Sequence, residues 1–184
     1  MLIVFTGNGK GKTTAALGVA LRALSWKKRV AIIQFIKGNK EVGEYKFLKS
    51  YKLQANKLIN IFQFFDDTKL SITEKSILNN PEYKKSCEEA WEFAKKVIEE
   101  KKHDLIVLDE ICNAMHLGLL KEKDVLDFIR RNSSLICCNS DISVILTGRN
   151  ASEKLIDLAD LVTEMKEVKH PFQKGISAKE GIDY

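Results

Sequence analysis

The sequence contains little proline and no long apolar run. Only two prolines, Pro81 and Pro171, occur among its 184 residues, so helices and strands can follow one another with few interruptions. No apolar stretch approaches the roughly 18 to 20 residues that a membrane-spanning helix needs. The first residues form a strand-sized run and lack the basic and long apolar regions of a signal peptide. We therefore expect a cytoplasmic protein without a membrane span.

The residues that mark several enzyme classes are sparse or scattered. The four cysteines lack the C-x-x-C spacing of zinc and redox sites, and the three histidines lack metal-ligand spacing, so we interpret the cysteines as structural thiols. Neither a G-x-S-x-G motif nor an obvious Cys/His pair indicates nucleophilic catalysis by the protein. We expect the chemistry to belong to the bound reactants. The cysteines are Cys87, Cys112, Cys137 and Cys138.

Composition and charge fit an ordinary globular enzyme. The apolar fraction of 45% is typical of globular proteins, and we expect residues 1–184 to form a single domain. The net charge of +5 is modest, and both signs are interspersed along the chain. The charge suits an anionic ligand, and we expect no nucleic-acid partner.

Apolar runs alternate with helix-like segments along the chain. Near-continuous apolar runs predict buried strands at residues 2–5, 29–35, 104–108 and 142–146, and weaker ones at 58–62 and 161–164. Helical spacing predicts helices at residues 12–26, 81–102, 121–131 and 151–158. This order predicts an α/β fold with a mostly parallel sheet, helices on both faces and ligands beyond the carboxyl ends of the strands. Residues 63–80 and 167–184 have no clear assignment, and we interpret both as active-site loops.

A glycine-rich loop joins the first predicted strand to the first predicted helix. Its glycines let backbone N–H groups approach an anion at a helix N-terminus, as a triphosphate requires. We expect Lys12 to reach phosphate oxygens, Thr13 to bind Mg²⁺ and Lys10 to add a second cation. The pattern departs from G-x-x-x-x-G-K-[ST], since Thr6 occupies the first glycine position; a glycine turn without a ligand is the alternative. The loop consists of Gly7, Asn8, Gly9, Lys10, Gly11, Lys12, Thr13 and Thr14.

Two carboxylates follow the strand predicted at residues 104–108. Asp109 and Glu110 resemble a Walker B element, in which a strand ends at a hydrated metal beside the phosphate loop. Because Mg²⁺ takes only one or two carboxylates, we expect one of the pair to bind metal and the other to orient water or a loop. An ordinary helix N-cap with an acidic first turn is the alternative.

A second polar turn, Thr147-Gly148-Arg149, follows the strand predicted at residues 142–146. The turn lies at the same predicted edge of the sheet as the glycine loop. We expect Arg149 to stabilise phosphate charge. A surface arginine at an exposed turn is the alternative.

Several segments taken together match one enzyme family. They are the glycine loop, the acidic strand end, the turn at Arg149, the second strand with its exit at residues 30–38, and the tail. The tail contains DLVTEM at residues 160–165, VKHPF at residues 168–172 and GIDY at residues 181–184, which are not general features of P-loop proteins. Over essentially the whole chain these segments resemble the P-loop type of ATP:corrinoid adenosyltransferase.

This resemblance implies a P-loop NTPase (RecA-like) fold and a transferase reaction. The Co(I) of a reduced corrinoid attacks C5′ of ATP, and triphosphate leaves. The resemblance also implies Mg²⁺ or Mn²⁺ held by Thr13, Asp109 and Glu110, an electron donor such as a flavoprotein, and a homodimer. Lys12, Glu110 and Arg149 are the expected catalytic residues. The tail, residues 167–184, is expected to pack at the active site.

The chain departs from the family pattern in two places. Members often carry an extra N-terminal segment that helps to cover the active site, whereas this sequence begins at its first strand. The region at residues 61–65 lacks the tryptophan that better-known members place at the corrinoid. Phe64 and Phe65 are therefore the candidates to exclude water and displace the axial ligand of cobalt, and simple core packing of an aromatic cluster is the alternative.

Two other functions share the phosphate-binding features. A P-loop kinase of small metabolites would carry an arginine-rich lid, and residues 63–80 contain no arginine. A non-catalytic nucleotide-binding regulator would bind ATP without turnover.

Overall fold

The computed structural model describes residues 1–50, 58–68, 73–136, 140 and 142–182. Its centre is a parallel six-stranded sheet with the strand order β3-β2-β4-β5-β1-β6. All six segments predicted as strands form this sheet, including the two weaker ones. The strands are β1 (Leu2–Thr6), β2 (Val30–Gln34), β3 (Ile59–Phe62), β4 (Leu105–Asp109), β5 (Ser143–Thr147) and β6 (Leu161–Glu164).

The sheet is covered on both faces, which explains its continuous apolar strands. Alternate residues of β1 point to opposite sides: Ile3 and Phe5 pack with α1, whereas Leu2 and Val4 pack with the helices of the other face. Every residue of β1, β2 and β4 is buried. The predicted α/β fold with helices on both faces is confirmed.

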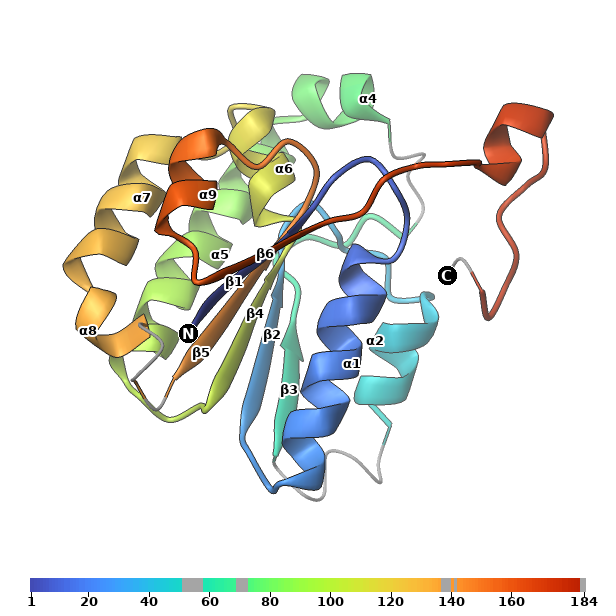
Figure 1. Ribbon diagram of the computed structural model, residues 1–184. Helices are drawn as coiled ribbons and strands as arrows, with labels where there is room; N and C mark the ends of the chain where they lie inside the picture. Colours follow the sequence, from blue (N-terminus) through green and yellow to red (C-terminus); the bar gives the residue numbers. More distant parts are fainter. Residues whose placement is uncertain (51–57, 69–72, 137–139, 141, 183–184) are drawn as a thin grey trace.

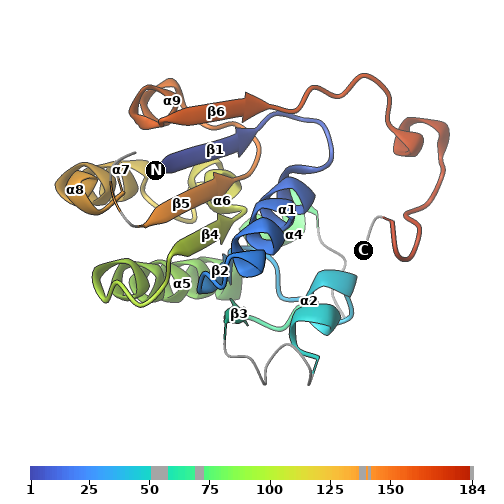
Figure 2. The same ribbon diagram turned by 60° about the horizontal axis from the view of Figure 1, so that its bottom comes forward.

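The helices divide unequally between the two faces (Figures 1 and 2). Helices α1 and α2 cover one face, and the longer set from α4 to α9 covers the other. The helices are α1 (Lys12–Ser25), α2 (Gly43–Leu48), α4 (Glu74–Asn79), α5 (Pro81–Glu99), α6 (Ile111–His116), α7 (Glu122–Arg131), α8 (Ser133–Ile136) and α9 (Glu153–Leu158), with a 3₁₀ turn, η1, at Pro171–Lys174.

The helices differ from the sequence-based prediction in their ends and in their number. Helix α5 ends at Glu99 rather than at residue 102, because Lys101 adopts a left-handed backbone with φ of 52°. Helix α9 begins at Glu153, where the Ser152 side chain caps it. The short helices α2, α4, α6 and α8 were not predicted, since four to six residues are too few to establish a helical period.

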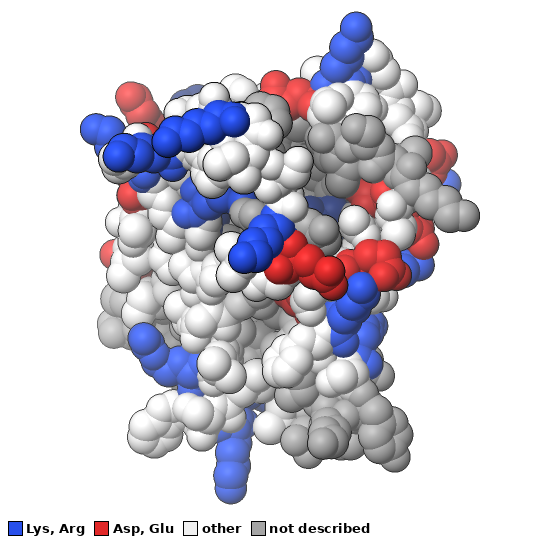
Figure 3. All heavy atoms as spheres, turned by 90° about the vertical axis from the view of Figure 1, so that its right-hand side faces the viewer, with Lys and Arg blue, Asp and Glu red and all other residues white. Residues whose placement is uncertain are grey.

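The chain beyond β6 crosses the glycine loop and then leaves the body of the molecule. Strand β6 is an exposed edge strand, and η1 lies apart from the sheet in both ribbon views (Figures 1 and 2). The face that carries this tail and α2 bears basic and acidic side chains in mixed groups (Figure 3). Among the described residues, no helix is both long enough and apolar enough to cross a membrane.

The cysteines that the structure describes are packed in the interior. Cys87 and Cys112 are buried free thiols, in agreement with a structural role. Burial raises the pKa of Cys87 to about 11 and that of Cys112 to about 12, which makes both thiols unreactive at neutral pH. Cys137 and Cys138 lie outside the described residues.

Candidate active site

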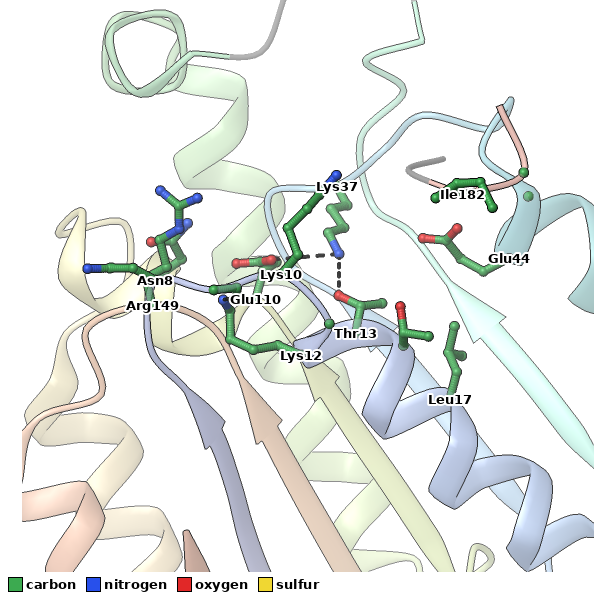
Figure 4. A pocket seen from close by; sticks show the side chains of 16 residues that line it. Asn8, Lys10, Lys12, Thr13, Leu17, Lys37, Glu44, Glu110, Arg149 and Ile182 are labelled. Atoms are coloured by element: carbon green, nitrogen blue, oxygen red, sulfur yellow. Dashed lines mark hydrogen bonds and ion pairs between the residues drawn. The ribbon is translucent and has the colours of Figure 1, made fainter. Parts of the chain in front are cut away.

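A cavity of about 800 Å³ lies beyond the carboxyl ends of the central strands. The glycine loop, the exits of β2, β4 and β5, the start of α2 and the end of the tail enclose it (Figure 4). Nine of the predicted site residues and seven further residues line the cavity. The predicted ones among them are Asn8, Gly9, Lys10, Gly11, Lys12, Thr13, Thr14, Glu110 and Arg149, and the others include Leu17, Lys37, Glu44, Asn113 and Ile182.

The glycine loop is held from outside by the chain that follows β6. The N–H of Gly9 donates to the carbonyl of Met165 at 2.7 Å, and the N–H of Met165 donates to the carbonyl of Thr6 at 2.8 Å. A Cβ atom at Gly7 would lie 2.5 Å from the Met165 carbonyl oxygen, and one at Gly9 would lie 2.8 Å from it. Only glycine fits this close approach. Thr6, at the first glycine position of the usual motif, does not need the backbone freedom of glycine, because it is still a residue of β1.

Lys12 begins α1 and is folded back onto the loop. Its ammonium donates to the carbonyl oxygens of Gly7 at 2.7 Å and of Gly9 at 2.8 Å. Burial lowers the pKa of Lys12, and the positive charges of Arg149 and Lys37 lower it further, whereas Glu110 opposes the shift. The N-terminus of α1 and this ammonium together provide a positive site that suits a phosphate group.

Asp109 is the centre of a hydrogen-bond network built by three neighbouring strands. The parallel register places Gln34, the last residue of β2, beside Asp109, the last residue of β4. Oδ1 of Asp109 accepts from the hydroxyls of Thr13 at 2.9 Å and of Thr147 at 2.7 Å, and its Oδ2 accepts from Gln34 at 3.1 Å. The carboxylate is fully buried. Its position is therefore fixed by the sheet rather than by a loop.

The two adjacent carboxylates have opposite pKa shifts. Burial alone would raise the pKa of Asp109, but the Lys37 ammonium at 2.9 Å and the donated hydrogen bonds outweigh it, so the pKa is lowered. Burial raises the pKa of Glu110, and the charge of Asp109 adds to the shift despite the Lys37 ammonium at 3.7 Å. Asp109 is thus the firmly ionised member of the pair.

Glu110 lies at the start of α6 but does not cap that helix with its side chain. Its backbone is left-handed, with φ of 65°, and its N–H donates to the hydroxyl of Thr147 at 2.9 Å. This backbone turn leaves the carboxylate at the cavity, where Figure 4 shows it between Lys12 and Lys37. Arg149 is exposed and lines the cavity beside Asn8. The roles predicted for Glu110 and Arg149 stay predictions.

Phe64 and Phe65 lie outside the lining of this cavity. The ring of Phe64 lies 5.5 Å from that of Phe93, and the ring of Phe65 meets Tyr83 edge-on at 5.0 Å, so α5 holds both. Each ring is half-buried against the larger core cluster. Core packing is therefore part of what both residues do, and contact with a corrinoid stays a prediction.

Gln63 connects the aromatic loop to the acidic strand end. Its side-chain N–H donates to Oε1 of Gln34 at 2.8 Å, and Gln34 in turn donates to Asp109. Oε1 of Gln63 is buried and has no hydrogen-bond partner in the described part of the chain. Two consecutive hydrogen bonds through Gln63 and Gln34 thus connect the aromatic loop after β3 to Asp109.

The comparisons with known proteins agree with this geometry. A family model described as ATP:corrinoid adenosyltransferase BtuR/CobO/CobP matches residues 1–184. The chain belongs to this family. The corrinoid adenosyltransferase of Escherichia coli K12 is 34% identical over 184 residues, which cover 100% of this chain and 85% of that protein. The corrinoid adenosyltransferase CobA of Salmonella typhimurium LT2 gives the same identity and coverage, and the enzyme of a Sinorhizobium species is 33% identical over 185 residues, or 100% of this chain and 80% of its own.

The fold of this adenosyltransferase family member also recurs at low sequence identity. The flagellar accessory protein FlaH of Methanocaldococcus jannaschii superposes with a TM-score of 0.56 over 89% of this chain and 70% of its own, at 16% identity. This likeness supports the α/β fold with its parallel sheet and carries no functional argument.

The sequence-based prediction missed several residues of the site. Lys37 and Gln34 bind Asp109, and Thr147 bridges Asp109 and Glu110, yet none had been given a role. A polar residue at the end of an apolar strand was the available indication for Gln34 and Thr147. Lys37 follows a strand exit and has no motif of its own.

Proposed function

We propose that this protein transfers the 5′-deoxyadenosyl group of ATP to the Co(I) of a reduced corrinoid and releases triphosphate. The observation that carries the proposal is the cavity lined by Lys12, Thr13 and Glu110, with Asp109 hydrogen-bonded to Thr13, in a chain that matches the adenosyltransferase family over its full length. The relatives named above as corrinoid adenosyltransferases support the same substrates.

The reaction requires the protein to stabilise a triphosphate leaving group. The lone pair of Co(I) forms a bond to C5′ of ATP while the C5′–O5′ bond breaks, and that electron pair leaves on the triphosphate. Negative charge therefore grows on the phosphate chain in the transition state. Lys12 and the loop amides at the start of α1 are placed to bind this charge, and Arg149 adds a guanidinium at the cavity wall.

The residues of the acidic strand end suit a divalent cation. Oxygens of Thr13, Asp109 and Glu110 converge on a single position, since all three lie within 2.8 to 3.7 Å of the Lys37 ammonium. Oxygen donors with one or two carboxylates are what Mg²⁺ and Mn²⁺ prefer. Such a cation would be held by these three side chains and would supply positive charge to the phosphates.

We extend the proposal to the position of the corrinoid, its electron donor, and the assembly and location of the protein. We place the corrinoid next to the aromatic loop after β3, where half-exposed Phe64 and Phe65 offer apolar surface beside the cavity. A reduced flavoprotein is the proposed electron donor, because Co(I) must be generated before transfer. We also propose a homodimer in the cytoplasm, the compartment that supplies ATP.

Adenosylation of a corrinoid tests this function directly. The protein is incubated in the dark with ATP, Mg²⁺ and a chemically reduced corrinoid, and the product is examined by absorption spectroscopy before and after exposure to light. We expect a light-sensitive Co–C product whose formation needs all three components. An unchanged corrinoid spectrum at full ATP occupancy would refute the transfer. Hydrolysis to ADP would then favour a kinase-like protein, and ATP binding without turnover would favour a regulator.

A further inference from the structure

Lys37 lies at the centre of the proposed metal site, although no motif assigns it a role. Its ammonium lies 2.8 Å from the Thr13 hydroxyl and 2.9 Å from Oδ2 of Asp109. It also lies 3.7 Å from Oε1 of Glu110. These are the three side chains expected to bind a divalent cation. A positive charge that belongs to the protein therefore already occupies the position that the metal would take.

The ammonium and a metal ion cannot use this position together. Their ligand oxygens are the same, and at the observed distances a second cation would lie against the first. Like charges at such separations repel strongly in a partly buried site. If the metal binds here, the Lys37 side chain has to leave.

The backbone around Lys37 is held too firmly to move with it. Ile36 is buried and has a left-handed φ of 60°, and the N–H of Lys37 donates to the carbonyl of Phe35 at 2.6 Å. Gly38 packs directly against the carbonyl of Phe65, leaving no room for a Cβ atom. The N–H of Gly38 also donates to the buried Asp67 at 3.1 Å. The tight turn therefore fixes where the side chain of Lys37 begins.

The side chain of Lys37, in contrast, has room to turn. It is 31% exposed and lines the 800 Å³ cavity. Figure 4 shows it entering from the opposite side to Lys12. A lysine has four rotatable bonds and a compact ammonium, so it can exchange one set of oxygens for another without a change in the backbone. Besides the carboxylate of Glu44, which also lines the cavity, the oxygens available to it there are those of a bound triphosphate.

We propose that Lys37 is an exchangeable counter-cation: its ammonium neutralises Asp109 and Glu110 until metal-bound ATP enters, and then turns into the cavity to bind a phosphate oxygen. The inference rests on the proposed function only in requiring that the ligand is ATP with a divalent cation. Lys37 is thereby a third lysine of the triphosphate site, beside Lys10 and Lys12. It also lowers the affinity of the empty site for metal alone.

Binding of Mn²⁺ without nucleotide tests the first half of the proposal. Free Mn²⁺ is measured by electron paramagnetic resonance for the wild type, Lys37→Met and Lys40→Met. Lys40 is a matched control, because it ion-pairs with Asp66 at 2.7 Å and does not line the cavity. We expect Lys37→Met to bind Mn²⁺ at least about tenfold more tightly than the wild type, since no ammonium has to be displaced. Lys40→Met should stay within about twofold of the wild type. Equal Mn²⁺ affinity in all three proteins would overturn the proposal.

Binding of Mg²⁺–ATP by the same proteins tests the second half. Loss of a phosphate contact should weaken the affinity of Lys37→Met for Mg²⁺–ATP at least about tenfold in calorimetry. Unchanged or tighter nucleotide binding would show that Lys37 does not reach the phosphates and would overturn the proposal. Neither titration contains a corrinoid, so their outcome is independent of whether adenosyl transfer occurs.

The wild type provides a further measurement that needs no variant to fold. Acetylation of lysines is followed by mass spectrometry, with Lys40 as the internal reference. Lys37 should become at least about threefold more reactive when Mg²⁺ alone is bound, because its ammonium is released from the carboxylates. It should be protected again when Mg²⁺ and ATP are bound together. An unchanged Lys37 reactivity across the three states would contradict the exchange.

Discussion

The triphosphate side of the cavity and the aromatic loop after β3 lie at the same edge of the sheet but are held in different ways. On the triphosphate side, adjacent strands place Gln34, Asp109 and Thr147 side by side, and hydrogen bonds of 2.7 to 3.1 Å lock the buried carboxylate. In the loop, Phe64 and Phe65 are half-exposed and pack their rings against α5 and the larger core cluster.

The triphosphate side of the cavity is therefore a rigid electrostatic half of the proposed site, and the aromatic loop is an adaptable apolar half. Charge stabilisation depends on groups that are already oriented before the reaction, which a sheet edge provides. A large, flat ligand needs surface that can adjust around it, and half-buried rings in a loop provide that. The Gln63–Gln34 hydrogen bond at 2.8 Å is one link between the halves, and the hydrogen bond from the N–H of Gly38 to Asp67 at 3.1 Å is another.

Lys12→Ala should disable the electrostatic half and cause the largest loss of adenosylation activity. The variant loses the ammonium that begins α1 while the loop backbone remains held by Met165. We expect kcat/KM for adenosylation to fall at least about a hundredfold, as when one preorganised charge donor is removed from a transition state. Lys40→Ala, which removes an equal charge outside the cavity, should keep nearly full activity, and near-normal turnover of Lys12→Ala would disprove the assigned role.

Thr147→Val should show that the network is structural as well as electrostatic. The buried hydroxyl donates to Asp109 and accepts from the N–H of Glu110, so an isosteric methyl removes one of the hydrogen bonds to Asp109 and takes away the partner of the Glu110 N–H. We expect the free energy of unfolding, measured in urea, to fall by about 2 to 3 kcal/mol. Thr147→Ser keeps the hydroxyl and should lose about 1 kcal/mol or less. Equal losses in the two variants would mean that packing, not hydrogen bonding, dominates at this position.

The electrostatic half was also the more predictable from sequence. Strands, their parallel arrangement and the glycine loop follow from local patterns, because apolar runs and glycine spacing are short-range features. Lys37 could not be predicted in this way, since its contacts with Thr13 and Asp109 join parts of the chain 24 and 72 positions apart. Nor could the contact of Met165 with Gly9, which depends on how the chain leaves β6.

Phe64→Ala tests whether Phe64 in the aromatic loop contacts the corrinoid or only packs against the core. If Phe64 contacts the corrinoid, the KM for corrinoid should rise about tenfold while the affinity for ATP changes less than about twofold. Phe62 packs on the same Phe93 ring at 4.6 Å from the end of β3, so Phe62→Ala controls for lost packing. If both variants lose stability and neither changes the KM for corrinoid, core packing is the whole role of Phe64.

Asp67→Asn should have the smallest effect, a change in how stability depends on pH. Burial raises the pKa of Asp67 above its ordinary 3.8, although Tyr83 and the N–H of Gly38 donate to it. The native state therefore binds this proton more tightly, and the stability that it contributes below the ordinary pKa is lost as pH rises toward the native value. In urea titrations from about pH 4 to 7, Asp67→Asn should gain stability relative to the wild type as pH rises. A constant difference across that range would show that Asp67 does not carry the shift.

The fate of the phosphates tests the central claim most directly. The protein is incubated with ATP, Mg²⁺ and chemically reduced corrinoid, and the products are followed by ³¹P nuclear magnetic resonance together with the absorption of the corrinoid. The proposed function predicts one inorganic triphosphate for each adenosylated corrinoid. Release of orthophosphate with ADP, or of triphosphate without an adenosylated corrinoid, would contradict it.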